Sequence, residues 1–172
     1  MKVWITAVGK SPFAVINPIW MSCKSGEFIP ERVYMIWNEN VSHQRKLVER
    51  GVSIILKRHG VRDPEIIADK RTKVKENDFT GFKSLLEMIR DKELERGSEI
   101  AVDMTPGRKF MSALLMGLGF GRRTVQRVYY LHLSDERYLN TPLPLIPVKI
   151  QKLYEMRSEL DVVEKGRTSG LA

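Results

Sequence analysis

The sequence predicts one α/β domain, a Rossmann-like three-layer sandwich with a largely parallel central sheet. Two observations lead to this fold class. Short apolar runs rich in β-branched residues alternate along the 172 residues with stretches of helical periodicity, as expected for strand–helix–strand units with right-handed crossovers. The chain is long enough for one substantial core, and its apolar fraction of 42% and charged fraction of 29% are typical of a globular domain.

Five apolar segments are expected to form the strands. The first, residues 3–8, is a nearly continuous apolar run, which indicates a central strand covered on both faces. The others are residues 33–37, a weak strand at 66–68, then 100–102 and 125–133. Residues 141–147 are interrupted by prolines and predict an edge strand or an extended arm.

Helical stretches separate these strands. An apolar stretch at residues 13–23 follows the first strand, and Ser42 is expected to cap a second helix that stops at Gly60. Asp78 is expected to cap a third helix that ends at Gly97. A fourth helix is predicted over the apolar residues 110–118.

The last part of the chain predicts a further helix. Residues 148–160 have helical spacing through Ile150, Leu153 and Tyr154, and a frayed tail is expected after them. The predicted organisation is therefore a ligand-binding domain over residues 1–147. Residues 148–172 are expected to form a C-terminal helix and tail that pack on this domain or extend from it.

The net charge indicates which kind of partner to expect, and the cysteine content indicates the cellular location. A formal net charge of +8 favours an anionic partner. Cys23 is the only cysteine, so no internal disulfide is expected, and a reducing, cytoplasmic location is predicted. No signal-peptide pattern opens the sequence, and no apolar run approaches the roughly 20 residues of a membrane span, so no membrane partner is expected.

Common cofactor and metal motifs are missing. Gly9-Lys10-Ser11 looks like the end of a Walker A loop, but Trp4 stands where that loop requires its first glycine. The Gly-x-Gly-x-x-Gly turn of a dehydrogenase is absent after the first strand. The three histidines have no ligand-like spacing. Neither a cofactor nor a metal site is therefore predicted.

One stretch of the chain has the chemistry of a phosphate site. The strand at residues 100–102 runs into Asp103-Met104-Thr105-Pro106-Gly107-Arg108-Lys109 and then into an apolar helix. The first amides of that helix lack internal acceptors and carry the positive end of the helix dipole. Gly107 lets a ligand approach the backbone, and two cations follow it. Such a turn suits a phosphate, although a turn that only caps its helix, with Arg108 and Lys109 solvated, is the alternative.

The predicted fold brings a second turn to the same crevice. In a doubly wound sheet the first and fourth strands lie side by side at the topological switch point, and ligands bind beyond their carboxyl ends. The turns after these two strands should therefore face each other, with Asn38 at the end of the second strand close by. The candidate ligand-binding residues are Gly9, Lys10, Ser11, Pro12, Asn38, Thr105, Pro106, Gly107, Arg108 and Lys109.

Together the two turns resemble those of the CRISPR-associated Rossmann-fold (CARF) family. Residues 6–12, Thr-Ala-Val-Gly-Lys-Ser-Pro, resemble the family's Thr-x-Gly-x-Ser-Pro pattern, with one extra residue between Thr6 and Gly9. Residues 103–112, Asp-Met-Thr-Pro-Gly-Arg-Lys-Phe-Met-Ser, are similar to its Asp-x-Thr-Gly-Gly-Thr-Lys-x-Met-Ser pattern, with Pro106 in place of a glycine and Arg108 in place of a threonine. The order of elements also matches the family over roughly residues 1–135.

The resemblance implies a homodimer that binds a cyclic oligoadenylate, most often the four-membered ring of type III CRISPR signalling. No direct binding to duplex nucleic acid is expected. Ring nucleases of the family open the ring without metal, when a ribose 2′-OH attacks the adjacent phosphate. For this chemistry Ser11 and Lys109 are the catalytic candidates, with Lys10 and Arg108 as supporting cations. The alternative is a sensor or adaptor without catalysis, or the sensor domain of a larger CRISPR effector or regulator.

Overall fold

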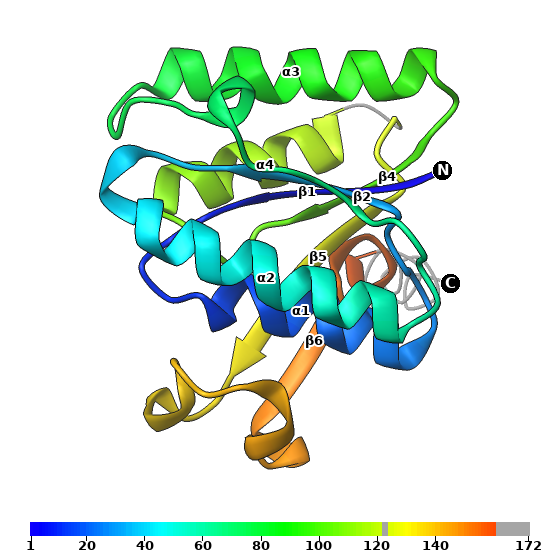
Figure 1. The fold of residues 1–172 in the computed structure, drawn as a ribbon, viewed down its shortest axis with the longest axis vertical. Coiled ribbons are helices and arrows are strands. Elements are labelled where there is room, and N and C mark those ends of the chain that lie inside the picture. The colour runs from blue at the N-terminus through cyan, green and yellow to red at the C-terminus, as the bar shows by residue number, and fades with distance from the viewer. Residues whose placement is uncertain (122–123, 161–172) are drawn as a thin grey trace, which may run out of the picture.

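A computed structural model describes residues 1–121 and 124–160, and these residues form a six-stranded sheet between two layers of helices (Figure 1). The strand order is β3-β2-β1-β4-β5-β6. The first five strands are parallel, and β6 pairs with β5 in the antiparallel direction. The strands are β1 (Lys2–Ala7), β2 (Arg32–Ile36), β3 (Glu65–Ile67), β4 (Glu99–Asp103), β5 (Arg127–Leu133) and β6 (Gln151–Glu155).

Four long helices make the two outer layers. Figure 1 shows α1 and α2 on one face of the sheet and α3 and α4 on the other. Because β1 is covered on both faces, alternate residues of this strand enter two separate cores, Trp4 on the α1 side and Ile5 on the α3 side. The helices are α1 (Phe13–Ser25), α2 (Ser42–Arg58), α3 (Phe79–Glu95) and α4 (Lys109–Gly121).

The sheet confirms the predicted fold class. β1 lies between β2 and β4, with Thr6 paired to Met35 on one side and to Asp103 on the other. The strand order therefore reverses direction between β1 and β4, which is the switch point that the sequence predicted. Asp78 caps α3 as expected, since its side chain accepts a hydrogen bond from the Gly81 amide at 2.7 Å.

The prediction of a helix over residues 148–160 is wrong for most of its length. Val148–Ile150 is a single 3-10 turn, Gln151–Glu155 is strand β6, and only residues 156–160 are helical. The pairing with β5 decides this, because Leu131 faces Leu153 and Tyr130 faces Tyr154 across the two strands. The expected tail, residues 161–172, lies outside the described residues, and the division at residue 147 stays a prediction.

Two further local predictions need correction. Residues 141–147 contain a 3-10 turn, Leu143–Leu145, and no strand, so of the two predicted alternatives the edge strand is wrong and the arm remains. Ser42 does not cap α2, because it is the first residue of that helix and a 3-10 turn, Glu39–Val41, precedes it. Asn38 caps this turn instead, since its side chain accepts a hydrogen bond from the Asn40 amide at 3.0 Å. No helix in the described part of the chain is long and apolar enough to cross a membrane.

Candidate functional site

The turns after β1 and β4 touch each other at the switch point. A methyl group added to Gly9 would lie 3.0 Å from the backbone nitrogen of Gly107. Gly107 has a φ of 96°, a left-handed conformation that favours glycine, and a methyl group there would lie 3.2 Å from the Ala7 side chain. Larger side chains at either position would push the turns apart. The prediction that the two turns converge is therefore confirmed.

A cavity of about 380 Å³ opens beside this contact. Five of the predicted ligand-binding residues line it: Gly9, Lys10, Asn38, Gly107 and Arg108. Five further residues complete its wall, and the sequence analysis selected none of them: Val8, Asn40, Val41, Glu76 and Met111. The cavity thus has an apolar floor and a polar rim made by three turns and the connection between β3 and α3.

The other predicted ligand-binding residues lie around the cavity without lining it. The Thr105 hydroxyl accepts a hydrogen bond from the Leu131 amide at 2.8 Å, which ties the turn to β5, and Pro106 is buried. Both residues therefore fix the position of the turn. Pro12 is the residue that precedes α1. Lys109 is exposed at the first position of α4.

Ser11 is turned toward a different part of the chain. Its hydroxyl donates a hydrogen bond to the Leu139 carbonyl at 3.0 Å, in the connection between β5 and β6. Asn17 on α1 makes a similar link, because its side chain donates to the Thr141 carbonyl and accepts from the Leu143 amide. The catalytic candidate Ser11 is therefore also one of the residues that hold α1 and this connection together.

Asp103 supports the site from below. Its side chain is fully buried, and it accepts hydrogen bonds from the Thr6 hydroxyl at 3.2 Å and from the Thr105 amide at 2.9 Å. Burial raises the pKa of this carboxyl to about 7, although both hydrogen bonds act in the opposite direction. Asp103 thus links β1 to the turn that carries Gly107.

The charges at the cavity are partly neutralised. Arg108 forms an ion pair with Glu76, and the same carboxylate accepts a hydrogen bond from Asn40 Nδ2 at 2.6 Å. Among the described residues, Lys10 and Lys109 make no ion pair. The first turn of α4 begins at this rim, so its backbone N–H groups add positive potential. No group of three or more potential metal ligands is found in residues 1–121 and 124–160.

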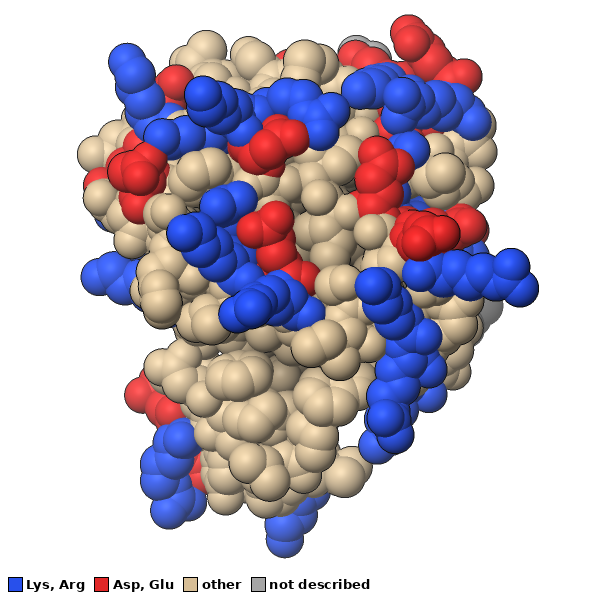
Figure 2. Space-filling model, viewed as in Figure 1, with Lys and Arg blue, Asp and Glu red and all other residues tan. Residues whose placement is uncertain are grey.

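Charged side chains cover most of the molecule unevenly. Figure 2 shows Lys and Arg interspersed with Asp and Glu over the helices, while the protruding part at the bottom of the view is largely uncharged. That part contains the connection between β5 and β6, where Leu145 and Val148 are exposed (Figure 1). On the face seen in Figure 2 the positive side chains are therefore spread among acidic ones and do not gather in one patch.

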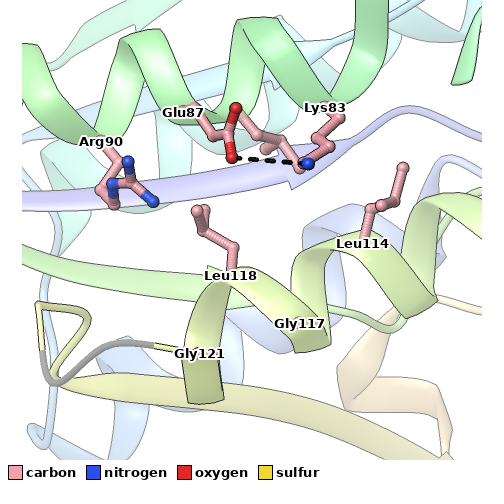
Figure 3. Close-up of a pocket in the computed structure, with 8 residues that line it drawn as sticks. Lys83, Glu87, Arg90, Leu114, Gly117, Leu118 and Gly121 are labelled. Carbon is pink, nitrogen blue, oxygen red and sulfur yellow. Dashed lines mark ion pairs between the residues drawn. The ribbon is translucent and has the colours of Figure 1, made fainter. Parts of the chain in front are cut away.

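A second cavity lies away from the predicted site and shares no lining residue with it. It has a volume of about 250 Å³ and lies between α3 and α4 (Figure 3). Lys83, Glu87 and Arg90 on α3 face Leu114 and Leu118 on α4, and Lys83 pairs with Glu87 at 3.9 Å. No strand-end turn lines this groove, so it lacks the backbone donors that the switch-point cavity offers.

The fold and the site define a Rossmann-like α/β protein with a candidate crevice between the turns after β1 and β4. No protein-family model matches the sequence, and no curated protein is similar to it. Solved structures do match. Enterococcus italicus Csm6 bound to cyclic hexa-2′-fluoro-hexa-dAMP superposes on 99% of this chain with a TM-score of 0.62 and 17% identity.

Two other matches are type III CRISPR proteins or their relatives. A type III CRISPR defence DNA nuclease activated by cyclic oligoadenylate matches 77% of this chain and 19% of its own, with a TM-score of 0.51 and 17% identity. Can2 from Sulfobacillus thermosulfidooxidans, in complex with cyclic tetra-adenylate, matches 77% of this chain and 31% of its own, with a TM-score of 0.50 and 16% identity.

These neighbours are CARF-domain proteins, and this chain has the fold of a CARF domain. The chain spans less than half the length of each of them, since its match covers 45% of the Csm6 chain.

Proposed function

We propose that this chain binds a cyclic oligoadenylate of type III CRISPR signalling in the crevice between its β1 and β4 turns. The observation that carries the proposal is the contact of Gly9 with Gly107, beside a cavity that Lys10 and Arg108 also line. A phosphate there accepts hydrogen bonds from free backbone N–H groups and meets the positive end of a helix dipole. Csm6 and Can2, which share the fold, were solved with cyclic oligonucleotides bound.

The proposed binding unit is a cytoplasmic homodimer with the ring on its two-fold axis. A cyclic tetra-adenylate has two-fold symmetry, and a two-fold dimer presents the same surface twice. One copy of the cavity offers the cations of a single subunit, Lys10 and the Arg108 that is paired with Glu76, and Lys109 lies next to Arg108 at the start of α4. Two copies double that charge around one ring of phosphates.

We further propose that the ring is cut by a metal-independent ring nuclease reaction. The 2′-OH of one ribose gives up its proton and attacks the adjacent phosphate, and the bond from that phosphate to the next 5′ oxygen breaks. That oxygen takes up a proton and leaves as a 5′-OH, and the other end of the product is a 2′,3′-cyclic phosphate. Lys109 would stabilise the charge on the phosphate, and Ser11 would hold one of its oxygens. In this role the Ser11 hydroxyl exchanges the Leu139 carbonyl for the ligand.

A sensor without catalysis is the second candidate. It is favoured by one observation: neither Ser11 nor Lys109 lines the cavity, and the Ser11 hydroxyl already has an acceptor in Leu139. A sensor binds the ring, leaves it intact and passes the signal to another domain or partner.

Calorimetry and chromatography with cyclic tetra-adenylate test these proposals together. Calorimetry should give one ring per two chains, and Lys109→Ala should weaken binding by about tenfold because one charge-assisted contact is lost. After incubation, chromatography should show linear products in the presence of EDTA, and no products from a ring with 2′-deoxyribose. In Ser11→Ala, cleavage should slow by about a hundredfold while binding changes little.

Each outcome separates the alternatives. A ring that is bound but recovered intact after hours identifies the sensor. A stoichiometry of one ring per chain contradicts the dimer crevice. A protein that gives no binding heat with rings of any size contradicts the proposed function as a whole.

A further inference from the structure

An acidic side chain stands in the wall of a cavity proposed to bind phosphates. Glu76 belongs to the connection between β3 and α3. Backbone hydrogen bonds from this connection to Trp37, the residue after β2, fix it beside the site. The Trp37 amide donates to the Thr72 carbonyl at 3.1 Å, and the Val74 amide donates to the Trp37 carbonyl at 2.9 Å. Glu76 is therefore held at the rim of the cavity by the fold.

Both oxygens of Glu76 contact residues that line the cavity. Oε1 pairs with the Arg108 guanidinium, and Oε2 accepts from Asn40 Nδ2 at 2.6 Å. Arg108 is the residue that replaces a threonine in the family's turn pattern, so the pair adds one cation and one anion to this crevice. Its net contribution to the charge of the cavity is zero as long as the pair is closed.

A phosphate and the Glu76 carboxylate need the same donors. A guanidinium binds a carboxylate or a phosphate through the same planar pair of N–H groups. A ligand phosphate that takes the N–H groups of Arg108 facing Glu76 displaces the carboxylate, and the displaced carboxylate then stands close to a like charge. The Arg108 side chain is 53% exposed and the Glu76 side chain 34% exposed, so solvent screens the pair and the exchange is feasible.

We propose that Glu76 is an affinity-determining residue of the site, which competes with ligand phosphates for Arg108. This inference rests on the proposed function, because it assumes an anionic ligand in the crevice. Glu76 keeps Arg108 occupied when the ligand is absent. It weakens the binding of every anion that depends on Arg108, so that only a ligand with several phosphates in place keeps the exchange favourable.

Glu76→Gln tests the proposal, with Glu39→Gln as its matched control. Glu39 belongs to the neighbouring 3-10 turn, pairs with Lys73 and does not line the cavity. Both substitutions remove one negative charge from the same side of the molecule, so a difference between them reports the contact with Arg108 and not the net charge. The probe is cyclic tetra-adenylate, with inorganic tripolyphosphate as a second anion.

Glu76→Gln should bind cyclic tetra-adenylate about fivefold more tightly than the wild type, while Glu39→Gln should stay within about twofold. The slope of log K against log salt should become steeper by about 0.7 in Glu76→Gln, because the contact of Arg108 with a phosphate is no longer offset by the loss of the Arg108–Glu76 ion pair. Adding Arg108→Ala to Glu76→Gln should remove this increase in slope. Glu76→Ala should shift the affinity in the same direction, and the melting temperatures show whether each variant is folded.

Two results would overturn the proposal. One is an affinity of Glu76→Gln equal to or weaker than that of the wild type, for both probes. The other is an equal gain in Glu39→Gln, which would assign the effect to long-range charge. Both differ from a failure of the proposed function, in which the wild type itself shows no affinity for cyclic tetra-adenylate.

Discussion

At the scale of single residues, Asp103 connects the two halves of the site. Its carboxylate lies under the β4 turn and is bonded to the Thr6 hydroxyl and the Thr105 amide. Because burial raises its pKa to about 7, this group changes charge in the neutral range. The folded protein therefore holds the Asp103 proton more tightly than the unfolded chain does, where the ordinary value is 3.8.

Asp103→Asn should make the effect of this titration on stability measurable. For a carboxyl with a raised pKa, the stabilising contribution is complete below pH 3.8 and is lost as the pH rises through about 7. Asparagine resembles the protonated carboxyl at every pH. We therefore expect the unfolding free energy of the wild type to fall relative to that of Asp103→Asn between pH 4 and pH 8. Denaturant titrations at several pH values measure this difference, and a constant difference would contradict the assignment.

At the scale of elements, α4 shows how one helix fits against the sheet through a glycine. Gly119 is buried, and a methyl group there would lie 2.3 Å from Val128 Cγ2 on β5 and 3.2 Å from Val102 Cγ2 on β4. A methyl group on Gly117 would meet no atom within 4 Å. The glycines of this helix therefore differ in role although the sequence presents them in one Gly-x-Gly run.

Gly119→Ala and Gly117→Ala should change stability in opposite directions. Alanine is the better helix former by up to about 1 kcal/mol, and at Gly117 nothing opposes that gain. At Gly119 the methyl group overpacks the contact with β5, which typically costs about 1–3 kcal/mol. Thermal unfolding should show a higher melting temperature for Gly117→Ala and a lower one for Gly119→Ala. A stabilised Gly119→Ala would mean that α4 can move away from the sheet.

Local patterns predicted the parallel part of the sheet and missed its last strand. The apolar runs of β1, β2 and β4 and the glycine turns after β1 and β4 depend on nearby residues, so the sequence was sufficient for them. The spacing of Leu153 and Tyr154 fits a helix equally well, and β6 forms because these residues pair with β5. The same difference applies to the site. The places of Gly9 and Gly107 could be predicted from nearby residues. Glu76 lines the cavity only because Lys73, three residues before it, pairs with the distant Trp37.

At the scale of the whole molecule, the two ends of the sheet carry different groups of polar residues. The carboxyl ends of the strands carry the candidate site, and the amino ends carry a buried ionic network. Glu93 on α3 is fully buried and accepts hydrogen bonds from Arg32 at 2.8 Å, from Tyr34 at 2.7 Å and from Ser98 at 2.8 Å. Burial opposes the ionisation of Glu93, but these bonds and the Arg32 charge hold its pKa below the ordinary value.

Glu93→Gln should therefore destabilise the fold without changing the site. Removing one partner of a buried ion pair costs about 3–5 kcal/mol when the other charge is left alone, and we expect the lower part of this range because Arg32 keeps Glu65 as a partner at 2.6 Å. The affinity for cyclic tetra-adenylate, measured below the melting temperature, should remain that of the wild type. In the wild type this stabilisation is present above pH 4.5 and is lost as the pH falls through the lowered pKa. A large loss of affinity in a folded Glu93→Gln would contradict the separation of the two ends.

The central position of β1 has a consequence for the order of events during synthesis. Thr6 on β1 and Asp103 on β4 are hydrogen-bonded neighbours although 97 residues separate them in sequence. On the ribosome, β1 can pair early with β2, but its other edge stays open until β4 has emerged. Contacts of such long range form slowly, since a large loop must close first. The candidate crevice, which needs both strands, can therefore take shape only after β4 has emerged.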